Sequence, residues 1–299
     1  MASLICGSLA FDSIMTFEGR FAEQILPDQL HILNVSFLVP ALRRDFGGCA
    51  GNIAYSLKML GGQPLPMATL GSDGADYLKR LNDLGISTEF VRQVEDIYTA
   101  QAMIMTDRDN NQITAFHPGA MMQAHSLRIE KRADIKLGII SPDGRDAMLQ
   151  HAEQFNAAGI PFVFDPGQGL PMFDGDELAR FVDQATWVTV NDYEGKMLSE
   201  RTGLSHADIS RRVDGLVVTL GAHGCEVWVG GEKTVVPPVK ARDVVDPTGC
   251  GDAWRGALLF GLEQGWSLAK CAALGNQVGA LKIAQRGPQN YNVDGLAIA

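Results

Sequence analysis

Short apolar runs alternate with longer segments of helical period along the chain. The runs are bounded by Gly, Pro, Asn or Asp and predict buried strands at Leu4–Cys6, Leu65–Leu70, Leu137–Ile140, Phe162–Phe164, Trp187–Val190 and Leu216–Leu220. The helical segments are Ala50–Leu60, Ala75–Leu84, Asp143–Ala158, Glu194–Arg201 and Gly251–Leu262. Continuous apolar strands that alternate with helices predict an α/β fold, with a doubly wound, mostly parallel sheet flanked by helices.

Three segments break this alternation, at about residues 13–18, 30–40 and 98–117. They have the pattern of extended strands with no helix between them, and the last is typical of a β-hairpin with its turn at residues 109–111. We expect them to form a small separate sheet, a lid over the carboxyl edge of the main sheet, where open α/β sheets bind ligands. The alternative is that they are edge strands of the main sheet.

Length and composition narrow the class of protein. The 299 residues fit one large α/β domain over residues 1–299 with an interleaved lid, and 46% apolar with 20% charged residues excludes a disordered chain. The net charge of −10 without a basic run argues against nucleic acid and anionic membranes as partners. No apolar stretch is long enough for a transmembrane helix and no signal peptide is evident, so we expect a cytoplasmic protein.

The cysteines and histidines do not suggest a disulfide framework or a zinc site. Five cysteines is an odd number, without paired spacing, and the six histidines are scattered. The chain also lacks the glycine-lysine motif of P-loop enzymes and the glycine fingerprint of dinucleotide-binding folds.

The segment Asp246–Asp252 carries the strongest chemical signal. A helix is predicted to begin near Gly251, which puts Gly249, Cys250 and Gly251 at its N-terminus. Unpaired backbone N–H groups and the positive end of the helix dipole make such a position an anion site, and Cys250 would contribute its backbone N–H rather than its thiol. Asp252 is placed either to accept a proton from a hydroxyl that attacks phosphorus or to cap the helix.

A second segment has paired glycines, Gly47 and Gly48, before a helix, and Asn52 one turn inside it. Glycines allow a ligand to approach the backbone, and the Asn52 amide offers a donor and an acceptor to a pair of sugar hydroxyls.

Together these segments resemble the signatures of the ribokinase-like (PfkB) sugar kinase family. Asp246–Asp252 is similar to the pattern Asp-Thr-x-Gly-Ala-Gly-Asp, with Pro247 and Cys250 as departures, and residues 47–52 are similar to Gly-Gly-x-x-x-Asn. The resemblance implies a ribokinase-like fold, an anion hole at the glycines and a catalytic base at Asp252. It further implies that Asp12 accepts hydrogen bonds from ribose hydroxyls, although Asp12 is also a typical turn residue.

The resemblance also implies ATP and Mg²⁺. Asn191 and Glu194 are similar to an Asn-x-x-Glu motif that organises Mg²⁺ and phosphate through water, while the same spacing is that of a helix capping box. The remaining nucleotide-binding positions are a Thr-x-Gly-x-x-Gly loop and one residue of a helix that the family packs against adenine: Thr219, Gly221, Gly224 and Asn276.

A monovalent cation is a further implication of the resemblance. Asp246 and the carbonyl of Thr248 fall where some members hold such an ion, for example K⁺. Lid sheets of the family often pair between subunits, which predicts a homodimer through the lid, unless its exposed face is covered by its own chain.

Residues 35–46 and 114–119 resemble bacterial adenosine kinases of that family. Phe37 and Phe116 would then stack on a purine, or else form the core of the lid. The sequence predicts an ATP-dependent kinase that phosphorylates a primary hydroxyl of a ribofuranosyl substrate, with adenosine or a related nucleoside as first choice and a free sugar as second. The alternative from another class is a catalytically silent, nucleoside-binding regulator on the same fold.

Overall fold

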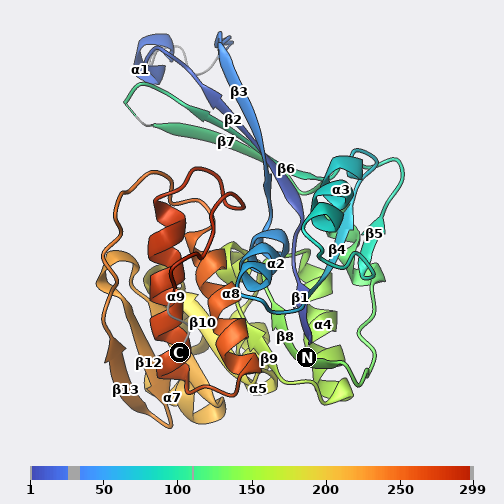
Figure 1. Cartoon of the computed structure of the whole chain (residues 1–299), viewed down its shortest axis with the longest axis vertical. Coiled ribbons are helices and arrows are strands. Elements are labelled where there is room, and N and C mark those ends of the chain that lie inside the picture. The colour runs from blue at the N-terminus through green and yellow to red at the C-terminus, as the bar shows by residue number, and fades with distance from the viewer. Residues whose placement is uncertain (1, 26–33, 110, 297–299) are drawn as a thin grey trace.

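The computed structural model describes residues 2–25, 34–109 and 111–296. Within them the larger sheet has nine strands in the order β13-β12-β11-β10-β9-β8-β1-β4-β5 (Figure 1). The strands from β11 to β5 are parallel, and β12 and β13 extend the sheet antiparallel, which confirms the predicted mostly parallel sheet. The strands are β1 (Ala2–Cys6), β4 (Pro64–Leu70), β5 (Val91–Gln93), β8 (Ile135–Ile140), β9 (Phe162–Phe164), β10 (Trp187–Asn191), β11 (Gly215–Thr219), β12 (Cys225–Val229) and β13 (Glu232–Val236).

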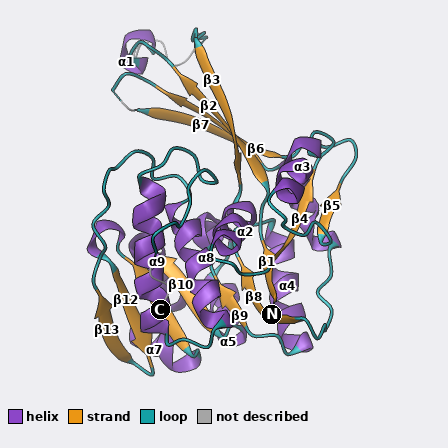
Figure 2. Ribbon diagram, viewed as in Figure 1, coloured by secondary structure: helices purple, strands orange, loops and turns teal. Residues whose placement is uncertain are grey.

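Helices cover both faces of this sheet, as a doubly wound fold requires (Figure 2). On one face α2, α3, α8 and α9 pack against residues such as Ile5 and Val217, and on the other α4 to α7 pack against residues such as Leu4 and Val218. Neighbouring residues of a strand point to opposite faces, so one apolar run serves both cores. The helices are α1 (Phe21–Gln24), α2 (Cys49–Met59), α3 (Ala75–Asp83), α4 (Arg145–Ala158), α5 (Gly175–Gln184), α6 (Asp192–Thr202), α7 (His206–Arg212), α8 (Cys250–Glu263) and α9 (Leu268–Ile283), with 3₁₀ helices at Gly119–Ser126, Gly167–Met172 and Gly221–His223. Among the described residues, none of these helices combines the length and the hydropathy of a membrane span.

A second, separate sheet projects beyond the carboxyl ends of the main strands (Figure 1). Its order is β3-β2-β6-β7, where β2 (Ala10–Thr16) runs parallel to β6 (Ala100–Thr106) and the other pairs are antiparallel. The predicted hairpin is formed by β6 and β7 (Gln112–His117), and β3 covers Ala41–Gly47. The small sheet is therefore distinct from the main one, and the alternative of edge strands is wrong.

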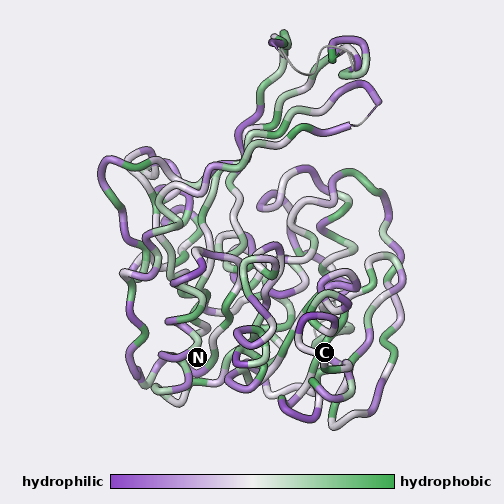
Figure 3. Tube along the Cα trace, turned by 180° about the vertical axis from the view of Figure 1, so that it is seen from behind, coloured by the Kyte–Doolittle hydropathy of each residue, from purple (hydrophilic) through white to green (hydrophobic). Residues whose placement is uncertain are grey.

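Strand register divides the side chains of the small sheet between two faces. Asp12 pairs with Ala102, and Ala102 pairs with Phe116, so all three lie on one face, here called the inner face. The other face, here called the outer face, is lined by Met15, Leu42, Met103, Met105 and Ile113. Hydrophobic and hydrophilic residues are mixed along these strands (Figure 3), because each strand contributes to both faces.

The predicted lid strand at residues 30–40 is wrong. Residues 34–39 form no strand, residues 30–33 lie outside the described part of the chain, and the strand that pairs with β2 begins only at Ala41. The apolar alternation that suggested a strand instead places Phe37 against Phe17 and Phe21, with ring centroids 5.0 and 5.2 Å apart. The actual strand carries adjacent charged side chains, so its hydropathy gave no strand signal.

Candidate active site

The start of helix α8 forms an uncapped cluster of backbone N–H groups. Its N-cap residue, Gly249, has φ +75°, and a Cβ there would lie 2.6 Å from Cβ of Pro288, so a larger residue would be strained. No side chain caps this helix, and among the described residues the N–H groups of Gly251 and Asp252 have no hydrogen-bond acceptor. Such groups, with the positive end of the helix dipole, attract an anion.

Asp252 lies beside these N–H groups and contacts the second predicted motif. Its Oδ2 accepts a hydrogen bond from Nδ2 of Asn52 at 2.8 Å, although the two residues are 200 positions apart. Burial raises the pKa of Asp252 to about 6, against the lowering effects of the Asn52 hydrogen bond and the Arg255 charge. A carboxyl group with this pKa is largely ionised at neutral pH and is basic enough to take a proton from an alcohol that is losing it.

The orientation of the Asn52 amide is fixed by a residue that the sequence analysis missed. Gln289 is buried, and its Nε2 donates to Oδ1 of Asn52 at 3.0 Å and to the hydroxyl of Tyr77 at 2.8 Å. The Tyr77 hydroxyl in turn donates to the carbonyl of Gly47 at 2.6 Å. With its oxygen occupied by Gln289, the Asn52 amide can only present its NH₂ group to Asp252.

A buried ion pair supports the same helix. Arg255, 5% exposed, donates two hydrogen bonds of 2.8 Å to the two carboxylate oxygens of Asp165, which directly follows β9. Its Nη2 lies 3.8 Å from Oε2 of Glu194. Arg255 is three residues after Asp252 on α8, so helical spacing is the one signal in the sequence that could have revealed it. A bidentate pair fixes a guanidinium in position and orientation.

Asn191 and Glu194 form the capping box that the sequence analysis had kept as an alternative. Oδ1 of Asn191 accepts from the Glu194 N–H at 2.7 Å, and Oε2 of Glu194 accepts from the Asn191 N–H at 2.8 Å. Burial raises the pKa of Glu194, and the charge of Asp165 adds to this effect. Among the described residues, Oε1 of Glu194 has no hydrogen-bond partner, so it is free to contact a water of a hydrated Mg²⁺ ion.

No protein-only metal cage is present among residues 2–25, 34–109 and 111–296. Within them no group of three or more His, Cys, Asp or Glu side chains is arranged to hold a metal. A carboxylate that contacts the ion through water, with phosphate oxygens as the main ligands, is consistent with this donor set.

Asp12, Gly47 and Gly48 lie together where the small sheet meets the main body. A Cβ on Gly47 would lie 2.5 Å from Oδ2 of Asp12, and Gly48, with φ +84°, would clash at 2.5 Å with the carbonyl of Ser8. Burial, with a contribution from the Asp45 charge, raises the pKa of Asp12 to about 6. The glycines thus leave the Asp12 carboxylate accessible beside the start of α2.

The two predicted aromatic contacts differ. Phe116 lies on the inner face, in the same cross-strand row as Asp12, and is 54% exposed, so its ring is open to a ligand. Phe37 packs edge-on against Phe17 and Phe21 and belongs to the aromatic cluster at the α1 end of the small sheet. The alternative of a lid-core residue therefore describes Phe37, and we do not place it in the site.

A cavity of about 670 Å³ lies between α8, α9 and the loop after β11. It brings together six of the predicted residues: Thr219, Gly221, Gly224, Cys250, Gly251 and Asn276. The Asn276 amide is held within its wall, since Oδ1 accepts from Nε1 of Trp254 at 3.1 Å and Nδ2 donates to the carbonyl of Pro237 at 2.8 Å. Trp254 and Gly275, which the sequence analysis missed, line the cavity as well.

The thiol of Cys250 has no chemical role in this geometry. Burial raises its pKa to about 11, so the sulfur stays protonated at neutral pH. That the residue contributes its backbone N–H rather than its side chain stays a prediction.

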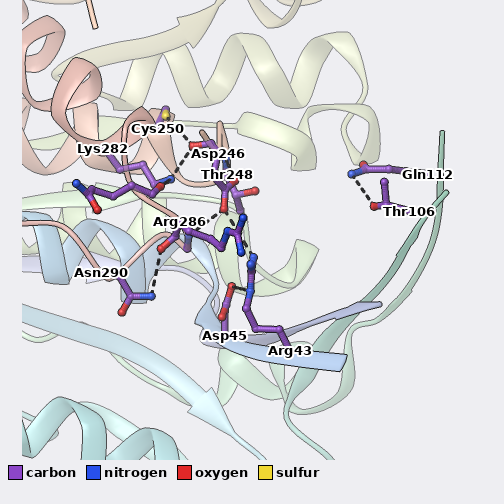
Figure 4. A network of polar contacts seen from close by, with 12 residues as sticks. Arg43, Asp45, Thr106, Gln112, Asp246, Thr248, Cys250, Lys282, Arg286 and Asn290 are labelled. Carbon is purple, nitrogen blue, oxygen red and sulfur yellow. Dashed lines mark hydrogen bonds and ion pairs between the residues drawn. The ribbon is translucent and has the colours of Figure 1, made fainter. Parts of the chain in front are cut away.

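Asp246 is held at the start of the loop that leads into α8 (Figure 4). Its Oδ1 accepts from the Thr248 N–H at 2.9 Å and its Oδ2 from the Gly287 N–H at 2.9 Å. Nη2 of Arg43, on β3 of the small sheet, lies 3.8 Å from the same Oδ2. These backbone hydrogen bonds lower the pKa of Asp246 against the effect of burial.

Comparison with known proteins identifies the family. The model of the pfkB family carbohydrate kinases matches residues 10–294, which is nearly the whole chain. The chain therefore belongs to the pfkB family, and it is an ATP-dependent phosphotransferase that acts on an alcohol group.

Several proteins that are similar to this chain are nucleoside kinases. A nucleoside kinase of Methanocaldococcus jannaschii is 30% identical over 97% of this chain and 93% of its own. The structure of Burkholderia thailandensis nucleoside kinase in complex with inosine is 54% identical, with a TM-score of 0.87 over 97% of this chain and 93% of that one. The same Burkholderia protein in complex with ADP-inosine is 56% identical, with a TM-score of 0.84 over 97% and 91%.

Proposed function

We propose that this protein is a nucleoside kinase, which transfers the γ-phosphoryl group of ATP to the primary hydroxyl of the ribose of a purine nucleoside, with adenosine as the first candidate. The observation that carries the proposal is the position of Asp252 between Asn52 and the uncapped N–H groups of α8. The site thus has a base for an alcohol next to an anion-binding helix end.

Each residue near α8 has a defined part in the proposed transfer. The acceptor hydroxyl gives its proton to Asp252 as its oxygen bonds to the γ-phosphorus, and the bond from that phosphorus to the bridging oxygen of ADP breaks. The N–H groups of Gly251 and Asp252 donate to the oxygens of the phosphoryl group in transit. Mg²⁺, when bound to the nucleotide, neutralises phosphate charge, and Oε1 of Glu194 would contact its water shell.

The cavity between α8 and α9 is the proposed site for the adenine and ribose of ATP. Its glycines leave the backbone open after β11, and Trp254 and Gly275 form one wall. Asn276 acts there by anchoring the wall, because both ends of its amide are already hydrogen-bonded.

The acceptor is proposed to bind beneath the inner face of the small sheet. The carboxylate of Asp12 accepts hydrogen bonds from ribose hydroxyls, and the exposed ring of Phe116 lies in the same row, suited to stack on a base. The Burkholderia relative with inosine supports a purine nucleoside as acceptor and makes inosine a candidate beside adenosine. A free sugar such as ribose remains the second candidate, because the family model describes carbohydrate kinases.

The outer face of the small sheet supports a homodimer. Leu42, Met103 and Ile113 on this face are 69%, 38% and 41% exposed, and an exposed apolar sheet face is an association surface. We propose that two copies of the chain pair through it.

The decisive experiment is a substrate panel with a variant that separates base recognition from sugar recognition. We measure kcat/KM of the wild type and of Phe116→Ala with adenosine, inosine, ribose and fructose. The wild type should prefer the nucleosides, and Phe116→Ala should lose about 2- to 10-fold on nucleosides because a stacking pair is removed, with no loss on ribose. Gln112→Ala, an exposed residue at the far end of the same strand, is the control.

The outcomes separate the candidate functions. A wild type that prefers ribose or fructose would make the protein a sugar kinase. Binding of nucleosides without turnover of any substrate would favour the silent regulator on the same fold.

A further inference from the structure

Lys282, in the last turn of α9, is a lysine with no exposed surface. Its side chain is 0% exposed, and its Nζ donates to the carbonyl oxygen of Asp246 at 2.8 Å and to that of Gln285 at 3.2 Å (Figure 4). Lysine is almost never fully buried unless its ammonium group is paired. Placing a positive charge at this buried position therefore costs desolvation free energy.

The surroundings of the ammonium are rich in oxygen and negative charge. The N–H groups of Val245 and Asp246 both donate to the carbonyl of Ile283, the last residue of α9, so the loop before α8 is tied to the end of α9. A helix C-terminus carries partial negative charge. Burial lowers the pKa of Lys282, whereas the charges of Asp246 and Asp45 favour the charged form and that of Arg43 opposes it.

The family resemblance implies a monovalent cation at Asp246, but the residues here do not fit one. Both carboxylate oxygens of Asp246 accept backbone N–H groups, and the Arg43 guanidinium lies 3.8 Å from Oδ2. The adjoining carbonyl of Asp246 is already bound by the Lys282 ammonium. A second cation at this point would be repelled by two protein cations and would find the three oxygens of Asp246 occupied.

We propose that the ammonium group of Lys282 takes the place of a monovalent cation, so that phosphoryl transfer by this protein needs neither K⁺ nor Na⁺. The ammonium connects the loop from Asp246 to Cys250 with the loop after α9. The first of these loops leads into the N–H groups of α8. Lys282 makes no hydrogen bond to Asp252 among the described residues and does not line the cavity, so it is a positioning residue.

The first test compares salts on the wild type. At matched ionic strength, kcat and the melting temperature are measured in K⁺, Na⁺ and tetramethylammonium chloride. We expect equal values in all of them, because no site is left for the metal ions. A several-fold rise of kcat, or a rise of the melting temperature, in K⁺ over tetramethylammonium would overturn the proposal, since an ion that binds the folded state stabilises it.

The second test removes the charge while keeping the length of the side chain. Lys282→Met in tetramethylammonium should lower kcat by about 10- to 100-fold, the effect expected when the anion-binding loop is displaced. Lys270→Met, which removes an exposed charge from the same helix, is the control and should keep wild-type kcat. A Lys282→Met variant with wild-type kcat would contradict the assignment.

The third test separates charge from packing. Lys282→Ala leaves room for a small cation, so K⁺ or ammonium should raise its kcat and its melting temperature, while tetramethylammonium is too bulky to do so. A variant that folds but gains nothing from any small cation would refute the assignment of a charge role. The kinetic measurements use a nucleoside and so depend on the proposed function, whereas the melting measurements need no substrate and test Lys282 alone.

Discussion

The two walls of the site are built in different ways. The wall formed by α8 and α9 is densely packed: Arg255 is 5% exposed, and a Cβ on Gly256 would lie 2.5 Å from Cβ of Ser56 on α2. The wall formed by the small sheet is open, with Leu42 and Phe116 69% and 54% exposed. The groups proposed to perform the chemistry therefore lie on the wall whose geometry is fixed by packing, and the groups proposed to recognise the acceptor lie on the exposed wall.

The walls meet through polar contacts as well as through a shared apolar cluster, which contains Phe11 of β2 and Leu258 of α8. Arg43 of the small sheet lies 3.8 Å from Asp246 before α8, and the charge of Asp252 contributes to the raised pKa of Asp12. The polar contacts depend on both walls being in place, so a change of these charged groups on one wall should be felt on the other. Variants on each wall test this division.

The largest effect is expected for Asp252→Asn on the packed wall. Removing the general base should lower kcat by about 10³- to 10⁴-fold, because an amide cannot take the proton of the acceptor hydroxyl. The dissociation constant of ATP, measured by calorimetry, should stay within about 3-fold of the wild-type value, since the N–H groups remain. Asp76→Asn, an exposed acid on α3, serves as the control. A variant with more than a tenth of wild-type kcat would remove the general-base role.

Asp12→Asn on the open wall should have a smaller and different effect. Hydrogen bonds to a charged group contribute about 1.5–3 kcal/mol, so kcat/KM for the acceptor should fall about 10- to 100-fold. The dissociation constant of ATP should not change, because Asp12 belongs to the small sheet. Asp109→Asn at the far end of that sheet is the control, because its carboxylate pairs with exposed Arg20 and lies away from the proposed site. An equal loss of ATP affinity would mean that the walls are not independent.

The pH dependence of kcat/KM should reflect carboxyl groups on both walls. Asp252 and Asp12 each have a pKa of about 6 and each acts as the carboxylate, so kcat/KM should fall as the pH drops through 6, with a limiting slope above one. Asn52→Leu removes the hydrogen bond that lowers the pKa of Asp252, so the acid limb should move to higher pH by about one unit. Asn156→Leu, on the exposed side of α4, should leave the limb in place. An unshifted limb in Asn52→Leu would show that Asp252 does not control it.

The main sheet could be predicted from the sequence because its signal is local, and the candidate site at the start of α8 has a local signal as well, although its chemistry stays a prediction. Continuous apolar strands define the sheet, and glycines next to Asp252 mark the anion site in adjacent residues. Strand β3 could not, since a strand with both faces partly exposed needs no apolar pattern. The contact of Asn52 with Asp252 arises only from the fold, and its supporting residue Gln289 has no motif of its own.

Buried charges were missed for a related reason. Arg255 and Lys282 belong to no charge motif, and a charged residue in a helix is usually exposed to solvent. Only the packing around them shows that Arg255 is enclosed with Asp165 and Lys282 with backbone carbonyls. The sequence thus marks the candidate binding groups through their motifs, whereas the buried residues that support these groups become visible only in the fold.

The smallest effect is expected for two glycines of α9, which form a matched pair. They test how closely the wall formed by α8 and α9 is packed. A Cβ on Gly275 would lie 2.4 Å from Nε1 of Trp254, whereas a Cβ on Gly279 would meet nothing within 4 Å. Gly275→Ala must displace Trp254 and disturb its hydrogen bond to Asn276, so we expect a loss of about 1–3 kcal/mol in the free energy of unfolding and a KM for ATP raised about 2- to 10-fold. Gly279→Ala should keep or raise stability by up to about 1 kcal/mol, because alanine favours the helix. Chemical denaturation of both variants measures the difference, and equal stabilities would mean that this wall tolerates overpacking as the exposed sheet does.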